Sequence, residues 1–266
     1  MRTTHWVMTA ILGLLLTGCA GMHTAPAPEV RQALAPTGKL RVGLTLGNPL
    51  SVTRDSASGE MKGVGFYLGK ELARRMGVLF EPVLYPTIGA LLDSGKSGNW
   101  DVAFIGFNPA RAKEWDFTTL HMEVEFGYLI AGGSSISTSA DVDRSGIRVA
   151  VPGKGLADSN LSRALKNAVV VRSPDLAAGL EMLKSGKADV FAGNKPSLFE
   201  ISDQLPGSRV LDGRFATDRQ GMAIPKGRGL GMAYARKFIE DAKSEGLVKA
   251  AIESAGIRGA VVAPLQ

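Results

Sequence analysis

Two short segments of the chain each bring together an amide, a cation and a proline, a combination that suits the binding of a small anion. The first is Asn108-Pro109-Ala110-Arg111 and the second is Asn194-Lys195-Pro196-Ser197. Proline favours the first turn of a helix, and the free N–H groups of a helix start attract anions. We therefore expect the two segments to contribute to one anion-binding site, with Asn108 and Asn194 at matching positions.

A second group of chemically active residues is His121, Glu123 and Glu125, which alternate along one segment. On a strand they would share a face, and a histidine with two carboxylates is a donor set that metals accept. Neighbouring side chains on one face of a strand rarely all reach one ion, and no second His or Cys cluster supports the site. We predict no metal and no cofactor here, and assign Glu125 to a hinge or cleft contact.

Both anion-binding segments follow a strand, and the approach to each strand is similar. Leu91-Leu92-Asp93-Ser94-Gly95-Lys96 leads to Asp101-Val102, and Leu183-Lys184-Ser185-Gly186-Lys187 leads to Asp189-Val190. In open α/β sheets, ligands bind at the carboxyl ends of the strands. Two lobes whose strand ends face each other would enclose a cleft, so the repeated pattern predicts a two-lobed α/β protein with its ligand between the lobes.

The elements that must hold these segments follow the pattern of βαβ units. Lys39–Leu44 reads as the first strand and Leu79–Leu84 as the second. Between them, four apolar residues fall four apart on one helical face, and Gly77 stands where a helix C-cap is expected; these residues are Val64, Leu68, Leu72 and Met76. Near the end of the chain Tyr234, Phe238 and Ala242 share a helical face that would return to lobe 1.

The first residues predict export and a lipid anchor. Arg2 precedes the apolar run from Val7 to Leu16, which is too short to span a bilayer as a mature helix. Leu16-Thr17-Gly18-Cys19 resembles the bacterial lipoprotein box, in which the cysteine is acylated. We predict a signal peptide over 1–18, lipid on Cys19, and a flexible tether over 19–37. Cys19 is the only cysteine of the chain, so no internal disulfide can form.

Composition narrows the class of partner. The formal net charge is +6, but Lys and Arg are scattered along the chain and do not cluster with aromatic residues. Nucleic-acid binding would concentrate this charge on one element, so we exclude it. We expect a monomer attached to a membrane through Cys19. Ala20 follows the anchor and is not an acidic retention signal, and the choice between inner and outer membrane stays open.

From Gly38 to about Gly256 the order of segments resembles the type II periplasmic solute-binding proteins of ABC importers, in the family that captures amino acids and related polar solutes. The most specific part is Arg111-Ala112-Lys113-Glu114-Trp115-Asp116-Phe117-Thr118, which is similar to the family's Thr-x-x-Arg-x-x-x-x-Asp-Phe-Ser segment. Other carriers are the Gly38–Gly43 start, the Gly59–Gly63 turn and the Gly186–Asp189 approach.

The resemblance implies a periplasmic protein that binds a small anionic or zwitterionic solute and presents it to an ABC permease in the inner membrane. It implies that Arg111 grips the carboxylate of that solute. It implies two lobes joined by crossing segments near Glu123–Ile130 and Phe215–Ala223. Lobe 1 would comprise 38–125 and 219–266, and lobe 2 would comprise 126–218.

The chain departs from the family's pattern at the ligand. Asn194 stands where the family carries the acid that pairs with the ligand's ammonium, and Lys195 beside it is either a second anion contact or a solvated lysine. The family's aromatic residue near the first strand is absent around Asn48, which we include among the ligand contacts. Asp158 is expected at the N-terminus of a helix over 159–168, where it would cap free N–H groups or contact the ligand.

Two other functions remain compatible with the fold. One is an enzyme resembling the cyclohexadienyl dehydratases, in which a cleft carboxylate acts as general acid and therefore needs a raised pKa. The other is a sensor or envelope accessory lipoprotein. We predict a binding protein and not an enzyme, because no Asp or Glu stands out in the sequence as such an acid.

Overall fold

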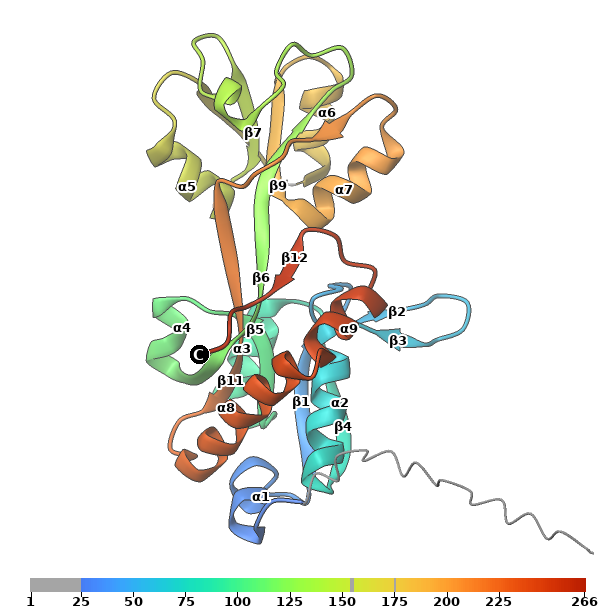
Figure 1. Cartoon of the computed structure of the whole chain (residues 1–266), viewed down its shortest axis with the longest axis vertical. Helices are drawn as coiled ribbons and strands as arrows, with labels where there is room; N and C mark the ends of the chain where they lie inside the picture. The colour runs from blue at the N-terminus through green and yellow to red at the C-terminus, as the bar shows by residue number, and fades with distance from the viewer. Residues whose placement is uncertain (1–24, 154–155, 175) are drawn as a thin grey trace, which may run out of the picture.

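Two bodies joined by two long strands make up the protein (Figure 1). The computed structural model describes residues 25–153, 156–174 and 176–266, so the predicted signal peptide and Cys19 lie outside the described residues. The joining strands are β6 (Trp115–Ile130) and β11 (Ala216–Pro225), which pair antiparallel. We call the body with the first strands lobe 1 and the other body lobe 2. The predicted two-lobed α/β fold is confirmed.

The main strands of both lobes belong to one sheet. Within the described residues it has ten strands, and its main path runs β4-β1-β5-β11-β6-β9-β7-β8. Lobe 1 contributes the parallel strands β1 (Lys39–Thr45), β4 (Leu79–Tyr85) and β5 (Val102–Gly106). Lobe 2 contributes the parallel strands β7 (Arg148–Pro152), β8 (Val169–Ser173) and β9 (Val190–Asn194). The short strands β10 (Arg209–Val210) and β12 (Ala260–Val262) also pair with β6.

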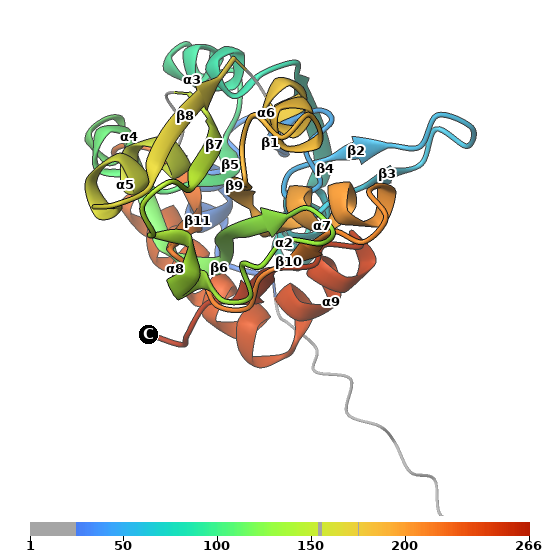
Figure 2. The same cartoon turned by 90° about the horizontal axis from the view of Figure 1, so that it is seen from above.

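Helices cover both halves of this sheet (Figure 1, Figure 2). Those of lobe 1 are α1 (Pro28–Leu34), α2 (Val64–Met76), α3 (Ile88–Lys96), α4 (Pro109–Glu114), α8 (Gly229–Ser244) and α9 (Leu247–Ser254). Those of lobe 2 are the 3-10 turn η1 (Ser139–Val142), α5 (Leu156–Ala164), α6 (Leu176–Lys184) and α7 (Lys195–Gln204). A hairpin of β2 (Thr53–Arg54) and β3 (Met61–Lys62) projects from lobe 1 in both views. In the part of the chain that the structure describes, no helix is both long and apolar enough to cross a bilayer.

Periodicity predicted the elements of lobe 1 well. The four apolar residues of α2 are all buried, and Gly77 ends the helix with a left-handed φ of 65°. Phe238 and Ala242 of α8 are buried in the same core. The predicted lobe boundaries, 125/126 and 218/219, fall inside β6 and β11. Because these strands run through both lobes, the boundaries stay a prediction.

The repeated Asp-Val sequence is a clamp that occurs in both lobes. In lobe 1 Asp101 accepts from the backbone N and the Nε of Arg41, each at 3.0 Å. In lobe 2 Asp189 accepts from the same two groups of Arg148, at 2.8 and 3.0 Å. Each aspartate thereby joins the start of its own strand to the start of the neighbouring parallel strand.

The two glycines of the repeat, by contrast, serve different purposes. Gly95 lies under the ring of Trp100, where a Cβ would come within 2.3 Å of the indole. Gly186 adopts a left-handed φ of 68° in a turn with open space around it. The similarity between the two segments therefore reflects the shared Asp–Arg contact and not a shared role of the two glycines.

Part of the predicted tether is helical. Residues 28–34, which we expected in a flexible segment, form α1, with Pro28 in the first turn. Leu34 is fully buried and packs against Gly231 of α8, where a Cβ would lie 2.8 Å from the leucine side chain. The two prolines before Glu29 suggested a linker, but the apolar contact with α8 fixes the end of that segment on lobe 1.

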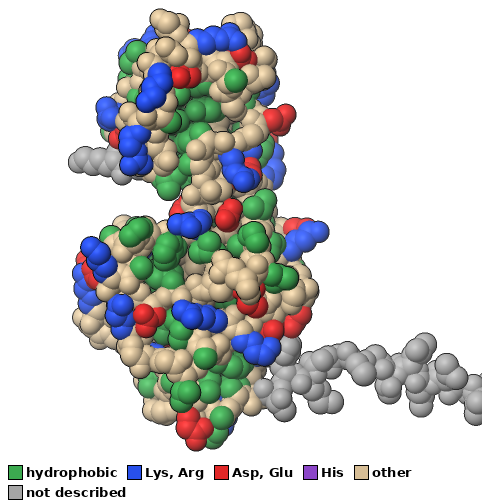
Figure 3. Space-filling model, turned by 60° about the vertical axis from the view of Figure 1, so that its left-hand side comes forward, with side chains coloured by type: hydrophobic (Ala, Val, Ile, Leu, Met, Phe, Trp, Pro, Cys, Tyr) green, Lys and Arg blue, Asp and Glu red, His purple; other side chains and the backbone are tan. Residues whose placement is uncertain are grey.

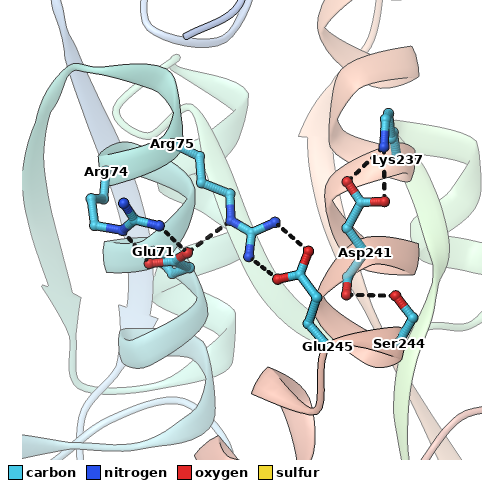
Figure 4. Close-up of polar contacts among 7 residues, drawn as sticks. All are labelled: Glu71, Arg74, Arg75, Lys237, Asp241, Ser244 and Glu245. Atoms are coloured by element: carbon cyan, nitrogen blue, oxygen red, sulfur yellow. Dashed lines mark hydrogen bonds and ion pairs between the residues drawn. The ribbon is translucent and has the colours of Figure 1, made fainter. Parts of the chain in front are cut away.

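Helices α2 and α8 are joined by a buried cation, as Figure 4 shows. Arg75 is 4% exposed, and its Nε donates to Glu71 at 2.7 Å. Its Nη1 donates to Glu245 at the end of α8 at 3.3 Å, and the guanidinium carbon lies 5.4 Å from the centroid of the Phe238 ring. Bonds from Arg74 and Arg75 lower the pKa of Glu71 to about 2. One guanidinium therefore neutralises carboxylates of two helices that are far apart in sequence.

A buried histidine lies in the core of lobe 1, on β6. His121 is 0% exposed, and neither ring nitrogen has a hydrogen-bond partner among the described residues. Its ring meets Phe104 of β5 edge to face, with centroids 5.5 Å apart. Burial, and then the charge of Lys243, lower the pKa of His121 to about 3. The folded protein therefore holds His121 neutral at all ordinary pH values.

Replacing Arg75 by methionine tests the link between α2 and α8. The variant keeps a long apolar stem but leaves Glu71 and Glu245 without their shared cation. We expect the free energy of unfolding to fall by about 2 kcal/mol, less than the roughly 3–5 kcal/mol for a fully buried pair, because Glu71 and Glu245 are partly exposed. Urea unfolding followed by circular dichroism measures this change.

The matched control for Arg75→Met is Arg74→Met, since Arg74 also bonds Glu71 but its side chain is 63% exposed. We expect a change within about 0.5 kcal/mol there. Equal losses in the two variants would contradict a role for burial.

His121 predicts a specific loss of stability in acid. An unfolded histidine takes up a proton near pH 6.5, whereas folded His121 does so only near pH 3. Between these values the unfolded state binds more protons, so stability falls with falling pH by up to about 1.4 kcal/mol per unit. His121→Leu removes this contribution. The stability of the variant relative to the unaltered protein should therefore rise from pH 7 to pH 4, as measured by urea unfolding at each pH. A difference that does not change with pH would refute the assignment.

Candidate ligand-binding site

A cavity of about 360 Å³ lies where the two lobes meet at the crossing strands. Figure 3 shows that the surface is hollowed between the two lobes. Lobe 1, the crossing strands and the start of α7 each contribute lining residues, which are Gly47, Asn48, Pro49, Leu50, Val124, Phe126, Asn194, Pro196, Ser197, Glu200 and Asp218. A second cavity of about 190 Å³ shares Asn48, Leu50 and Asp218 with the first and reaches into lobe 1 as far as Arg111. Together they offer the volume of a small solute.

Arg111 is held at the smaller cavity by the start of α4. Asn108 caps this helix and accepts from the backbone N of Arg111 at 2.9 Å. The Nη1 of Arg111 donates to the carbonyl of Gly106, at the end of β5, at 2.6 Å. Burial lowers the pKa of the guanidinium, and the charge of Asp218 opposes that shift. Among the described residues Arg111 makes no ion pair within 4.0 Å, so a positive charge faces the cavity.

Asp218 and Gln220 complete this end of the site, and the sequence did not single them out. They lie two apart on β11, and Gln220 Nε2 donates to Asp218 Oδ2 at 2.8 Å. A Cβ on Gly106 would lie 3.1 Å from Arg111 Nη1, 3.1 Å from Asp218 Oδ1 and 3.3 Å from Gln220 Nε2. Burial raises the pKa of Asp218. The sequence signal that could have identified Asp218 and Gln220 is that two polar residues stand at alternate positions of a predicted crossing strand.

Asn194 and Asn48 line the larger cavity from opposite lobes. Asn194 caps α7 and accepts from the N of Ser197 at 2.9 Å. The Oδ1 of Asn48 accepts from the N of Leu50 at 3.0 Å. In each case the amide oxygen accepts from a backbone N–H, and the NH2 group can donate to a ligand. Asn108, the sequence counterpart of Asn194, borders neither cavity and acts on the site by positioning Arg111.

Glu125, assigned from the sequence to a hinge or cleft contact, and Lys195, expected as a second anion contact or a solvated lysine, form an ion pair with each other. Their charged groups lie 2.8 Å apart, and Arg214 lies 2.8 Å from the other oxygen of Glu125. The hydrogen bond from Lys195, and to a smaller extent that from Arg214, lowers the pKa of Glu125. Glu125 points to the opposite face of β6 from the cavity residues Val124 and Phe126. Neither Glu125 nor Lys195 lines the two cavities, because the pair joins the start of α7 to the crossing strands.

Asp158 also lies away from these cavities. Helix α5 begins at Leu156, three residues before the predicted start, so Asp158 is inside its first turn. Its Oδ2 accepts from Arg172 Nε at 3.1 Å, and its Oδ1 accepts from Ser162 at 3.0 Å. The carboxylate thus joins α5 to β8 within lobe 2. In the described part of the chain no group of three or more His, Cys, Asp or Glu side chains could hold a metal.

The sequence of residues 40–253 matches the model of the bacterial extracellular solute-binding proteins, family 3. The chain belongs to this family. Among curated proteins, the chain is 22% identical over 246 residues to the ABC transporter glutamine-binding protein GlnH of Bacillus subtilis, and the match covers 89% of each chain.

Solved structures agree with the family 3 assignment at the level of the fold. An ancestral cationic amino acid solute-binding protein superposes with a TM-score of 0.68 at 22% identity, over 85% of this chain and 98% of the other. An ancestral cyclohexadienyl dehydratase superposes with a TM-score of 0.58 at 23% identity, over 88% and 99%. At these identities the structures confirm the predicted periplasmic-binding-protein type II fold and nothing finer.

Proposed function

We propose that this family 3 protein is a periplasmic lipoprotein that captures a small carboxylate-bearing solute, an amino acid or a related organic acid, for an ABC importer. The observation that carries the proposal is the Arg111 guanidinium, which borders a cavity at the junction of the lobes without an ion-pair partner among the described residues. A guanidinium binds a carboxylate through two parallel charge-assisted hydrogen bonds and keeps its charge when partly buried.

Groups from both lobes make ligand-driven closure physically reasonable. Arg111 comes from lobe 1, whereas Asn194 and Ser197 stand at the N-terminus of α7 in lobe 2, where free N–H groups favour negative charge. A solute that touches both sides binds more strongly when the lobes are close. Its differential affinity then shifts the protein towards the closed arrangement, which is the form that we expect the permease in the inner membrane to receive.

The relatives support an amino acid as the solute class. GlnH is named as a glutamine-binding protein of an ABC transporter, and the ancestral protein is named for cationic amino acids. The lipid that we predict on Cys19 would hold the protein in a thin layer over the membrane. This raises its effective concentration at the permease.

One observation favours a second candidate, an enzyme of the cyclohexadienyl dehydratase type. Asp218 is a cavity carboxyl whose pKa burial raises, as a general acid requires, and one structural neighbour is an ancestral dehydratase. Incubation of the purified protein with prephenate, with product followed by absorbance, separates the two functions. We expect no turnover above the buffer rate, and turnover that Asp218→Asn abolishes would establish the enzyme.

Arg111→Met tests the binding function. We expect affinity for the solute to fall at least ~100-fold, because the ligand's carboxylate loses a charge-assisted pair in a partly dry cavity. Isothermal titration calorimetry of the full chain against a panel of amino acids, 2-oxo acids and dicarboxylates measures this. Lys113→Met, on the exposed side of α4, removes the same charge and should leave affinity within about twofold. Binding that Arg111→Met does not weaken, or a panel in which nothing binds, would overturn the proposal.

A further inference from the structure

The chain joins lobe 1 at the end opposite the ligand cavities. The Cβ of Ala25 lies 3.6 Å from the position of a Cβ on Gly77, the residue that ends α2 just before β4. After α1, the N of Gly38 donates to the carbonyl of Ala35 at 2.9 Å, and β1 follows directly. The smaller cavity borders the carboxyl ends of β1 and β5 instead. Figure 1 accordingly shows α1 at the end of lobe 1 that points away from lobe 2.

Helix α1 is fixed to this end by a close contact with α8. Leu34 is 0% exposed, and a Cβ on Gly231 would lie 2.8 Å from its side chain and 3.4 Å from Ala33. The two helices can approach this closely because Gly231 has no side chain. Cys19 lies six positions before Ala25, a stretch that reaches at most about 20 Å in any conformation. A lipid on Cys19 would consequently hold the α1 end of lobe 1 close to a membrane.

Two exposed leucines stand next to the glycines that contact the entering chain. Leu79 follows Gly77 by two residues and is 68% exposed. Leu230 directly precedes Gly231 and is 61% exposed. A single exposed leucine needs no partner, but these two lie at the end of the molecule to which the tether leads. An apolar contact of this kind suits the boundary between lipid headgroups and acyl chains.

The exposed lysines near these leucines are each paired with an acid. Nζ of Lys39, at the start of β1, lies 3.2 Å from an oxygen of Glu81. Nζ of Lys226, just before α8, lies 3.6 Å from an oxygen of Asp116. These pairs neither attract nor repel anionic headgroups strongly, so the affinity of this face for a membrane comes mainly from the leucines.

We propose that the face formed by α1, Leu79 and Leu230 rests on the phospholipid membrane to which the chain is tethered, with lobe 2 pointing away from the membrane. The inference rests on the lipid that we propose on Cys19, and it adds which face that lipid turns towards the bilayer. Two leucines bind a bilayer weakly, but the short tether raises their effective concentration at its surface. Ligand-driven closure would then move lobe 2 over a lobe 1 that the membrane holds in place.

The length of β6 makes this orientation measurable. The strand runs from Trp115, level with the start of β5, to Ile130, opposite Val190 at the start of β9. Its 16 residues span about 50 Å at the usual rise of a strand. Ser97 and Ser185 are exposed residues shortly before β5 and β9, so they mark opposite ends of the molecule.

The test measures energy transfer from a dye at each of these two positions to a dye-labelled lipid. The full chain is produced in a bacterial host, its acylation at Cys19 is verified by mass spectrometry, and it is inserted into vesicles of phosphatidylethanolamine and phosphatidylglycerol. Because Cys19 is the only natural cysteine, Ser97→Cys or Ser185→Cys supplies the single free thiol. We expect transfer from position 97 to be at least ~3-fold more efficient than from position 185, because position 185 lies about 50 Å farther from the lipid.

Gly231→Ala tests the role of α1. The added methyl group must displace Leu34, and a tether that runs freely to the start of β1 would reach about 65 Å. We expect the ratio of the two transfer efficiencies to fall below ~1.5, because either end of the molecule could then approach the lipid. The matched control is Gly229→Ala on the same helix, where a Cβ meets nothing within 4 Å and the ratio should stay unchanged. A Gly231→Ala chain that melts like the control and keeps the ratio contradicts the role of α1.

Leu79→Ser combined with Leu230→Ser tests the contact itself, because it leaves α1 in place. We expect the ratio to fall at least ~2-fold, since the tether alone permits other orientations. The matched control is Val169→Ser combined with Leu176→Ser, which removes two exposed apolar side chains of lobe 2 and should keep the ratio.

The outcomes separate this inference from the proposed function. Equal transfer from positions 97 and 185 in an acylated chain overturns the orientation, while the lipid anchor and solute capture by Arg111, measured by calorimetry, stand. Self-association in detergent that the double leucine variant abolishes would assign the face to a second copy of the chain and overturn the membrane contact. A chain without lipid on Cys19 overturns both this inference and the proposed lipoprotein.

Discussion

The antiparallel pairing of β6 with β11 is the constraint on which the rest of the molecule depends. The ladder runs from Ala216 opposite Phe126 to Pro225 opposite Trp115, and its register shifts near Gly221. Lobe 1 strands join it through β5, and lobe 2 strands join it through β9. Every rotation of one lobe against the other must therefore bend or twist these two strands. Asp218, paired opposite Val124, lies in the part that would deform.

The two faces of the crossing strands carry different chemistry. One face presents Val124, Phe126 and Asp218 to the cavities, and the other carries the ion pair of Glu125 with Lys195. Arg258, in the segment before β12, bonds Asp203 of α7 and stacks on Phe199, with 4.8 Å between the guanidinium carbon and the ring centroid. The ion pair of Glu125 with Lys195 and that of Arg258 with Asp203 therefore join α7 of lobe 2 to the rest of the molecule. Arg111 and Asp218, at the cavities, form no ion pair within 4.0 Å among the described residues. The separation of the two faces follows from the two-residue period of a strand.

Local signals in the sequence were sufficient for most of the strands and helices and for the helix starts that follow Asn108 and Asn194. Those features depend on residues within a few positions of each other. The bond between Lys195 and Glu125 joins positions 70 apart, and the neighbours of Asp218 on β5 are set by strand register, so neither could be read from spacing. The helix α1 was missed for the same reason, because its stability comes from Gly231 and its neighbours on α8.

The distribution of the cores also fixes an order of assembly for a chain that emerges N-terminus first. The two buried clusters of lobe 2 draw their members from Phe126 to Phe215, a continuous stretch. The main cluster of lobe 1 spans Leu34 to Ile257, and the contact of Arg75 with Glu245 joins residues 170 apart. Lobe 2 has its whole core once its own stretch has emerged, whereas lobe 1 must wait for α8 and α9. Until α8 and α9 have emerged, the apolar strands in the first half of the chain stay exposed. We expect the chain to be most prone to aggregation during this interval.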